Sequence, residues 1–261
     1  MAALQQGAKP SMKPIPALRA LLLLPVLAFL AACGSAPVQR ETVPAPTYPA
    51  TEPATGPVDA RTAAQNFVAV VDQMEPVVEA ECRRRQPQGR CDFLIAVDDR
   101  QGQPPNAYQT VNAEGRPVLA FTLALIADAR NRDEIAFVLG HEASHHILGH
   151  LPRTQAQAAT GAMILGTLAT IGGADAAGVK NAQELGASVA ARSYSKGYEL
   201  EADRLGTVLT WRAGFDPGRG AEFFRRLPDP GDRFLGTHPQ TADRQRAVWD
   251  TLRALQAGQL S

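Results

Sequence analysis

The stretch VLGHEASHHILGH, residues 138–150, holds four of the five histidines of this 261-residue chain. Within it, His141, Glu142 and His145 form the pattern H-E-x-x-H. Residues four positions apart on an α-helix lie about 40° apart around the axis and one turn along it, so both imidazoles can reach one point in space. The spacing therefore predicts a helix that presents two ligands to one metal ion, with zinc as the expected metal.

Glu142 has the position that a general base of zinc-dependent hydrolysis requires. It lies about 100° around the helix from His141, near the metal but not bound to it. Zinc lowers the pKa of a water molecule to about 7, and Glu142 can take a proton from that water and pass it to a leaving amine. The pattern predicts hydrolysis of peptide bonds; a surface helix that happens to be rich in histidine is the alternative.

A catalytic zinc ion needs a third protein ligand and an open fourth position. The two other histidines of the stretch are not expected to supply that ligand. His146 is adjacent to His145 and points elsewhere, and His150 would lie about 180° from His141 if the helix continued.

The stretch YELEADRLG, residues 198–206, offers a carboxylate instead. On a helix, Glu199 and Asp203 share one face, whereas Glu201 points away. Glu199 can bind zinc while Asp203 accepts a hydrogen bond from the free N–H of a ligand histidine, which would fix the orientation of that ring. A solvated acidic face is the alternative for this spacing.

Three motifs together resemble the HtpX/CAAX-prenyl-protease-like family of zinc endopeptidases, and within it the periplasmic, lipoprotein-type members. They are the H-E-x-x-H helix, the pattern E-x-E-A-D-x-x-G at 199–206 and T-H-P at 237–239. The likeness extends over roughly residues 62–255. It implies an α+β, mainly helical domain of the zincin (gluzincin) type, with a small β-sheet beside the active-site helix.

The resemblance also implies roles for single residues. Glu199 becomes the third zinc ligand, and Asp203 its supporting carboxylate. His238 would lie beside the metal, where it can steady an oxyanion or occupy the open position; a purely structural loop histidine is the alternative. The sequence departs from the family at Lys196, where an arginine is usual. It also lacks the transmembrane helices and the helical-repeat array of other members, so recruitment of substrates through repeats is not expected.

The N-terminus predicts a lipoprotein. In residues 1–33, basic residues precede an apolar run of about 13 residues, too short for a comfortable membrane span. LAAC, residues 30–33, matches a bacterial lipobox in which Cys33 is acylated and becomes the mature N-terminus. An ordinary cleaved signal peptide is the alternative. The Pro-rich residues 34–61 are expected to form a disordered tether to a metalloprotease domain at 62–261.

These features predict a periplasmic protein that a lipid anchor holds to the outer membrane. In that oxidising compartment, Cys82 and Cys91 are expected to form a disulfide, with two free thiols as the alternative. Lys and Arg number 26, as do Asp and Glu, so the charge indicates no nucleic-acid partner. The expected partners are polypeptide substrates and the outer-membrane assembly machinery.

Hydrophobic periodicity outlines the domain. The Ala/Gly-rich residues 156–191 are expected to form close-packed or mobile helices over the active site, with a peripheral membrane contact as the alternative. The remaining predicted elements are helices at 62–84, 122–130, 132–150, 194–214 and 241–256, a strand at 91–99, and a hairpin formed by 106–111 and 118–122.

The whole pattern favours a zinc endopeptidase in protein quality control. The rival is a zinc-bound, chaperone-like assembly factor with little or no proteolysis. A scaffold without metal is the third possibility.

Overall fold

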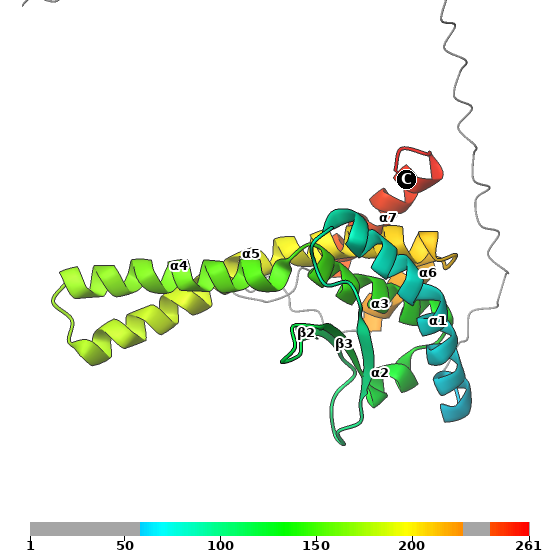
Figure 1. Cartoon of the computed structure of the whole chain (residues 1–261), viewed down its shortest axis with the longest axis horizontal. Coiled ribbons are helices and arrows are strands. Elements are labelled where there is room, and N and C mark those ends of the chain that lie inside the picture. Colours follow the sequence, from blue (N-terminus) through cyan, green and yellow to red (C-terminus); the bar gives the residue numbers. More distant parts are fainter. Residues whose placement is uncertain (1–57, 227–240, 261) are drawn as a thin grey trace, which may run out of the picture. The chain divides into compact units, whose positions relative to one another are not determined.

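The computed structural model describes residues 58–226 and 241–260, so Cys33 and His238 lie outside the described residues. The described part is mainly helical with one small sheet, as the sequence predicts (Figure 1). The elements are α1 (Ala60–Arg85), β1 (Leu94–Asp98), β2 (Ala107–Val111), β3 (Pro117–Thr122), α2 (Leu123–Asp128), α3 (Arg132–Ile147), α4 (His150–Ile171), α5 (Ala176–Arg212), α6 (Pro217–Gly220), the 3-10 helix η1 (Ala221–Arg226) and α7 (Thr241–Gln256).

Helix α1 begins where a side chain caps it. The carboxylate of Asp59 accepts hydrogen bonds from the amides of Arg61 and Thr62, which have no partner within the helix. The helix therefore starts at Ala60, two residues inside the range 34–61 that we predicted as tether. Hydrophobic periodicity in this helix predicts six apolar core positions. Four of them are buried, Phe67, Val70, Met74 and Val78, and two are half-buried against the core, Val71 and Val77.

The three strands form a sheet of order β1-β3-β2. β3 pairs in parallel with β1 and antiparallel with β2, so β2 and β3 make the predicted hairpin. Within the described residues, β2 pairs with β3 alone and is an edge strand. An edge strand presents unpaired amides and carbonyls to whatever lies beside it.

Helices α3 and α5 approach each other unusually closely at two glycines. A Cβ on Gly140 would lie 3.1 Å from the carbonyl oxygen of Gly206, and a Cβ on Gly206 would lie 3.0 Å from the amide nitrogen of His141. Any larger side chain at either position would push the helices apart. This contact lies one residue before His141 and one turn after Asp203, so it brings the H-E-x-x-H helix against the acidic helix.

The disulfide between Cys82 and Cys91 closes a loop against the C-terminal end of α3. From this loop, the side-chain amide of Gln86 donates to the carbonyl oxygens of His146 (3.0 Å) and Ile147 (2.8 Å). The last carbonyls of a helix have no partner within it, so these bonds stabilise its end. The loop thereby holds the helix that carries the predicted ligands.

Helices α4 and α5 pack along each other as a long hairpin (Figure 1). A Cβ on Gly161 would lie 2.2 Å from the carbonyl oxygen of Gly186, so small residues allow the two backbones to touch. The predicted close packing is confirmed. The predicted position over the active site is wrong for 156–191, because only the base of α4, at His150, Leu151 and Thr154, lines the central cleft.

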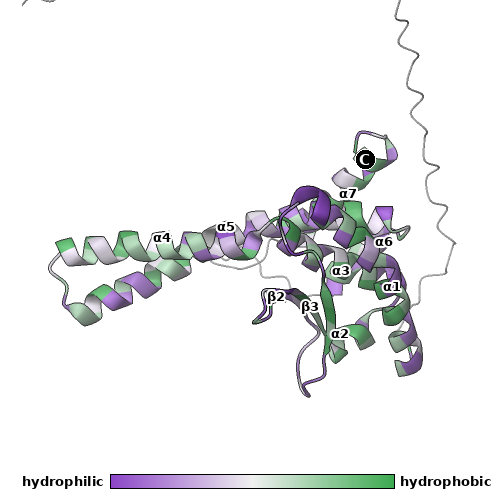
Figure 2. Ribbon diagram, viewed as in Figure 1, coloured by the Kyte–Doolittle hydropathy of each residue, from purple (hydrophilic) through white to green (hydrophobic). Residues whose placement is uncertain are grey.

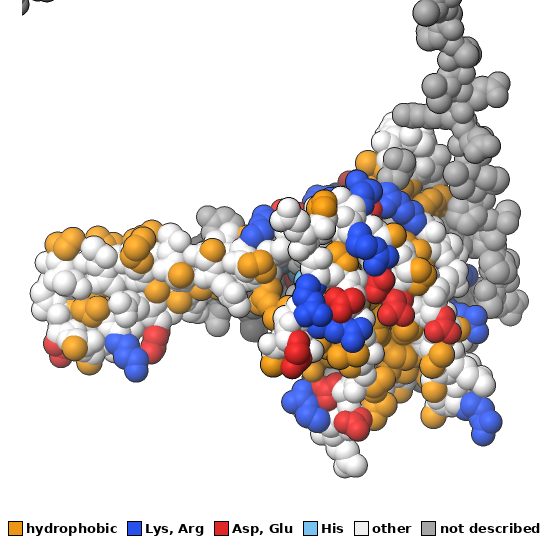
Figure 3. All heavy atoms as spheres, viewed as in Figure 1, with side chains coloured by type: hydrophobic (Ala, Val, Ile, Leu, Met, Phe, Trp, Pro, Cys, Tyr) orange, Lys and Arg blue, Asp and Glu red, His pale blue; other side chains and the backbone are white. Residues whose placement is uncertain are grey.

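The outer part of the hairpin is apolar on its surface. No charged residue occurs between Arg153 and Asp175, and Figure 2 colours much of this part of α4 white to green. In Figure 3, Lys, Arg, Asp and Glu gather on the body of the domain and only a few lie near the hairpin's tip. No helix among the described residues is long and apolar enough to cross a membrane. The exposed large apolar residues here are Met163, Ile164, Leu168, Ile171 and Leu185.

Glu81 links α1 to α5 through buried charge. Its side chain is 2% exposed and accepts from the guanidinium groups of Arg84 (2.8 Å), Arg85 (2.5 Å) and Arg212 (2.8 Å). Burial alone would raise the pKa of Glu81, but the hydrogen bonds from the three arginines lower it to about 2. The carboxylate is therefore stabilised in its ionised form.

A Glu81→Gln variant is expected to lose about 1–3 kcal/mol of unfolding free energy at pH 7. The folded-state pKa is lowered, so the contribution is present above the unfolded-state pKa, about 4.3, and is lost as the pH falls towards 2. Urea unfolding of the variant and the wild type at several pH values measures the difference. A difference as large at pH 2.5 as at pH 7 would contradict the role of this charge.

Candidate metal centre

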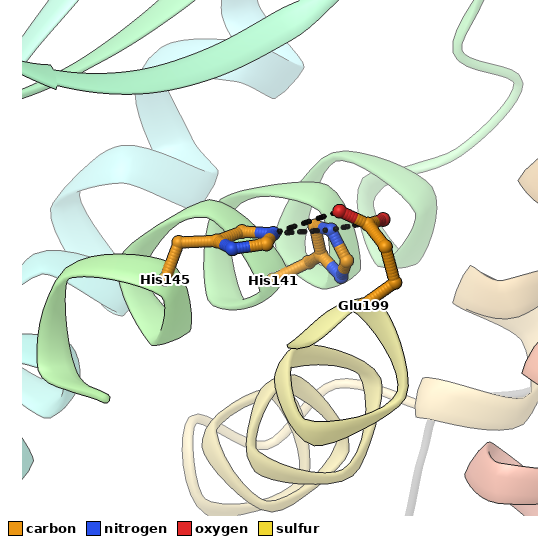
Figure 4. Close-up of side chains that lie close together, drawn as sticks. All are labelled: His141, His145 and Glu199. Carbon is orange, nitrogen blue, oxygen red and sulfur yellow. Dashed lines mark hydrogen bonds and ion pairs between the residues drawn. The ribbon is translucent and has the colours of Figure 1, made fainter. Parts of the chain in front are cut away.

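Three donor groups from two helices converge in the centre of the domain (Figure 4). The Nε2 atoms of His141 and His145, both on α3, lie 3.1 Å apart. The carboxylate oxygens of Glu199, on α5, lie 3.5 Å from Nε2 of His141 and 3.4 Å from Nε2 of His145. Ligand atoms about 2.0–2.1 Å from a tetrahedral zinc ion lie about 3.3–3.4 Å from one another. The three predicted ligands therefore have the spacing and chemistry that zinc requires.

Asp203 lies behind His141, where the sequence analysis placed it. Its Oδ1 is 2.9 Å from Nδ1 of His141, and its side chain is fully buried. Nδ1 of His141 donates to this carboxylate, which leaves the lone pair of Nε2 for a metal. The carboxylate itself is held by Arg244, whose Nε donates to Oδ2 at 2.9 Å and whose Nη2 donates to Oδ1 at 2.7 Å.

Arg244 is the site residue that the sequence analysis missed. It lies on α7, is buried, and stacks over the ring of Phe224 at 3.6 Å. Its Nη2 is also 3.6 Å from an oxygen of Glu199. The helical spacing of α7 could have indicated its role. Arg244 is the first residue of the buried face of this helix, and Ala247 and Val248 are the next. A charged residue at an apolar position indicates a buried partner.

The two ligand histidines differ in their affinity for protons. Burial lowers the pKa of His141, but hydrogen bonds to Asp203 and Glu199 raise it to about 10. Burial and the charge of His141 lower the pKa of His145 to about 3. Of the two ligand histidines, His141 therefore holds a proton more tightly than a free imidazole does, and His145 less tightly.

The charges around the triad favour a divalent cation. Asp203, Glu199 and Glu142 contribute three carboxylates, and Arg244 contributes one guanidinium. When both histidines are neutral, as metal ligation requires, and the three carboxylates are ionised, two negative charges are left without a counter-charge. A doubly charged ion would neutralise them, which agrees with the choice of zinc.

Glu142 contacts strand β2, whereas the three donor groups lie next to one another. Its carboxylate accepts a hydrogen bond from the backbone of Gln109 on β2, and burial and the charge of Glu199 raise its pKa. The contact places Glu142 between the donor triad and the edge strand. A general base in this place can reach a water molecule on either the metal or the substrate side.

A cleft of about 570 Å³ opens over the triad and runs along β2. The amide of Thr122 donates to the carbonyl of Asn106, and hydrogen-bonded pairs alternate along an antiparallel ladder. The backbone groups of Ala107 and Gln109 therefore point away from β3, towards the cleft that both residues line. Apolar side chains form other walls of the cleft: Leu125, Val138, Phe223 and Phe224.

His150 does not lie where the sequence analysis placed it. The helix does not continue, because Gly149 adopts a left-handed conformation (φ 67°) that turns the chain. His150 consequently comes back to His145, with 2.9 Å between their Nδ1 atoms, and is not one of the three clustered donors. His146 points elsewhere, as expected, with Nε2 2.8 Å from the carbonyl oxygen of Arg90.

The model of peptidase family M48 matches residues 67–251. The chain belongs to peptidase family M48. This M48 chain is 33% identical over 140 residues to a protein of Vibrio cholerae serotype O1 that is named, provisionally, beta-barrel assembly-enhancing protease. It is 32% identical over 124 residues to the beta-barrel assembly-enhancing protease of Yersinia pestis.

These matches cover part of each M48 relative. They span 48% and 45% of this chain, but 29% of the Vibrio cholerae protein and 25% of the Yersinia pestis protein. The family assignment makes the chain a metallopeptidase, and the range matched by the family model includes all three residues of the donor triad and Glu142. The resemblance noted in the sequence is confirmed at the level of the family.

Proposed function

We propose that this M48 chain is a zinc-dependent endopeptidase of the gluzincin type. The observation that carries the proposal is the spacing of 3.1–3.5 Å among the donor atoms of His141, His145 and Glu199, with Glu142 beside them. The donor set of two imidazoles and one carboxylate is that of catalytic zinc sites with an open fourth position.

The proposed mechanism divides the work between the metal and the protein. Zinc held by the triad would polarise the substrate carbonyl and acidify the attacking water. Glu142 takes the proton of that water and delivers it to the nitrogen of the leaving amine. Asp203 and Arg244 hold His141 in the orientation that ligation needs. By family resemblance, His238 steadies the oxyanion of the tetrahedral intermediate.

The substrate is proposed to bind in extended form along β2. The backbone groups of Ala107 and the carbonyl of Gln109 face the cleft and would pair with the main chain of a peptide, as in other cases of strand addition, whereas the amide of Gln109 donates to Glu142. The apolar wall formed by Val138 and Phe223 would receive a side chain of the substrate. Unfolded polypeptides, which expose backbone and apolar side chains together, fit this cleft.

The setting of the enzyme is proposed from its N-terminus and its relatives. Residues 1–33 would direct export, and acylated Cys33 would anchor the domain in the periplasm, on the outer membrane. The two named relatives are described as enhancing the assembly of β-barrels. We therefore propose misfolded periplasmic and outer-membrane proteins as substrates and the outer-membrane assembly machinery as a partner.

Metal analysis tests the proposal directly. The purified protein is expected to contain about one zinc ion per chain, and a zinc chelator should abolish cleavage of an unfolded outer-membrane β-barrel protein. Adding zinc back to the dialysed protein should restore cleavage. Cleavage that persists in the metal-free protein, or a protein that binds no zinc, would contradict the proposal.

A second function is favoured by the names of the relatives, which refer to assembly as well as to proteolysis. In that case the chain would hold outer-membrane proteins during assembly and would use zinc for its structure. Loss of the general base separates the two functions, as described in the Discussion.

A further inference from the structure

His150 is a buried histidine with a polar contact on each side of its ring. Its side chain is 4% exposed and lies at the start of α4. Its Nδ1 lies 2.9 Å from Nδ1 of His145, and its Nε2 lies 3.2 Å from Oε2 of Glu201. A line of polar contacts therefore runs from Glu201 through His150 to the ring of His145.

The direction of each hydrogen bond follows from the zinc site. If Nε2 of His145 offers its lone pair to the metal, Nδ1 of this neutral ring carries the proton and donates it. Nδ1 of His150 must then be the acceptor, so the proton of His150 lies on Nε2. That nitrogen faces the carboxylate of Glu201, which can only accept when ionised. Each nitrogen and oxygen in these two contacts is then either a donor or an acceptor, and no two donors or two acceptors face each other.

We propose that His150 and Glu201 are positioning residues that fix the tautomer and the ring orientation of His145. The inference rests on the zinc site of the proposed function and deepens it. His141 receives the same support directly from Asp203, whereas His145 receives it through an intervening imidazole. Each ligand histidine is thus held by its own pair of residues. Asp203 of α5 and Arg244 of α7 hold His141, and His150 of α4 and Glu201 of α5 hold His145.

The surroundings of His150 hold this arrangement in place. Its ring stacks on Tyr198, with 4.6 Å between the centroids and 13° between the planes. The guanidinium of Arg153 lies over the ring of Tyr198, 4.2 Å from its centroid, and donates to Oε2 of Glu201 at 3.0 Å. Since Arg153 balances the charge of Glu201, the effect on His145 is one of orientation more than of charge.

Packing alone is the competing explanation, because the stack of His150 on Tyr198 also joins α4 to α5. Two substitutions separate the explanations. His150→Phe keeps an aromatic ring for the stack but loses the acceptor for His145, whereas His150→Gln keeps an acceptor and loses the ring. Glu201→Met removes the other end of the line, and Glu184→Met makes the same change at an exposed position of the same helix.

The test measures zinc affinity of the full chain by competition with a chromogenic chelator. His150→Phe is expected to weaken zinc binding by about 10–100-fold, and Glu201→Met by about tenfold. His150→Gln should recover binding to within about threefold of the wild type, and Glu184→Met should bind as the wild type does. Thermal unfolding of the metal-free proteins reports separately on packing.

The outcomes distinguish this inference from the function on which it rests. A wild-type protein that binds no zinc would overturn both. Normal zinc binding by the wild type, with unchanged affinity in His150→Phe and Glu201→Met, would overturn only the positioning role. Normal zinc binding by His150→Phe together with weak binding by His150→Gln would assign the effect to the packing of the ring on Tyr198. If His150→Phe fails to fold, Glu201→Met decides alone.

Discussion

A Glu142→Gln protein is expected to lose about 10²–10⁴-fold in the rate of peptide hydrolysis while it still binds one zinc ion per chain. Glutamine has nearly the same shape but cannot take a proton from the attacking water. The triad of His141, His145 and Glu199 does not include Glu142, so zinc binding should persist. The measurement combines cleavage of a fluorescent peptide with metal analysis of the same sample.

The same variant separates the protease from an assembly factor. In cells that lack the wild-type protein, a protease predicts that Glu142→Gln fails to restore its function, whereas an assembly factor predicts rescue. Glu222→Gln, a change of an exposed ion-paired residue on η1, is the matched control. Near-normal cleavage by Glu142→Gln would rule out the proposed general base.

Replacement of Glu199 by alanine is expected to weaken zinc binding more than 100-fold and to abolish cleavage. Loss of a supporting residue alone costs about 10–100-fold in metal affinity, and Glu199 is proposed as a direct ligand. The variant also removes a carboxylate that hydrogen-bonds His141, so the metal-free site becomes less negative. Chelator competition and peptide cleavage measure the two effects.

Glu184→Ala is the control for this change, since Glu184 lies on the same helix and forms an exposed ion pair with Lys180. It should bind zinc and cleave peptides as the wild type does. An unchanged zinc affinity in Glu199→Ala would mean that the three donors, though close together, do not hold the ion.

The parts of the site that were predictable from the sequence depend on local spacing. His141, His145 and Glu142 share one helix, and the i, i+4 geometry of a helix is the same in every protein. Glu199 and Asp203 share another helix for the same reason. Their meeting is a tertiary event that depends on the contact between Gly140 and Gly206, and only the resemblance to a family indicated it.

The parts that were not predictable depend on where helices end and on long-range packing. The misplacement of His150 came from assuming that the helix continued past Gly149, although glycine at the end of a helix often turns the chain. Arg244 lies more than 40 residues from Asp203 along the chain, and no local pattern links the two. Its isolated charge on the buried face of α7 was the available signal.

The α4–α5 hairpin projects from the domain, and the start of α4 lies near the part of α5 that carries Glu199 (Figure 1). Its outer parts contact mainly each other, while His150 and Glu199, at its two bases, line the cleft. Whole turns can therefore be added to or removed from both arms without displacing the donor atoms. Evolution can vary the length and surface of this arm independently of the chemistry, and an engineer can use it to graft a binding module onto a peptidase.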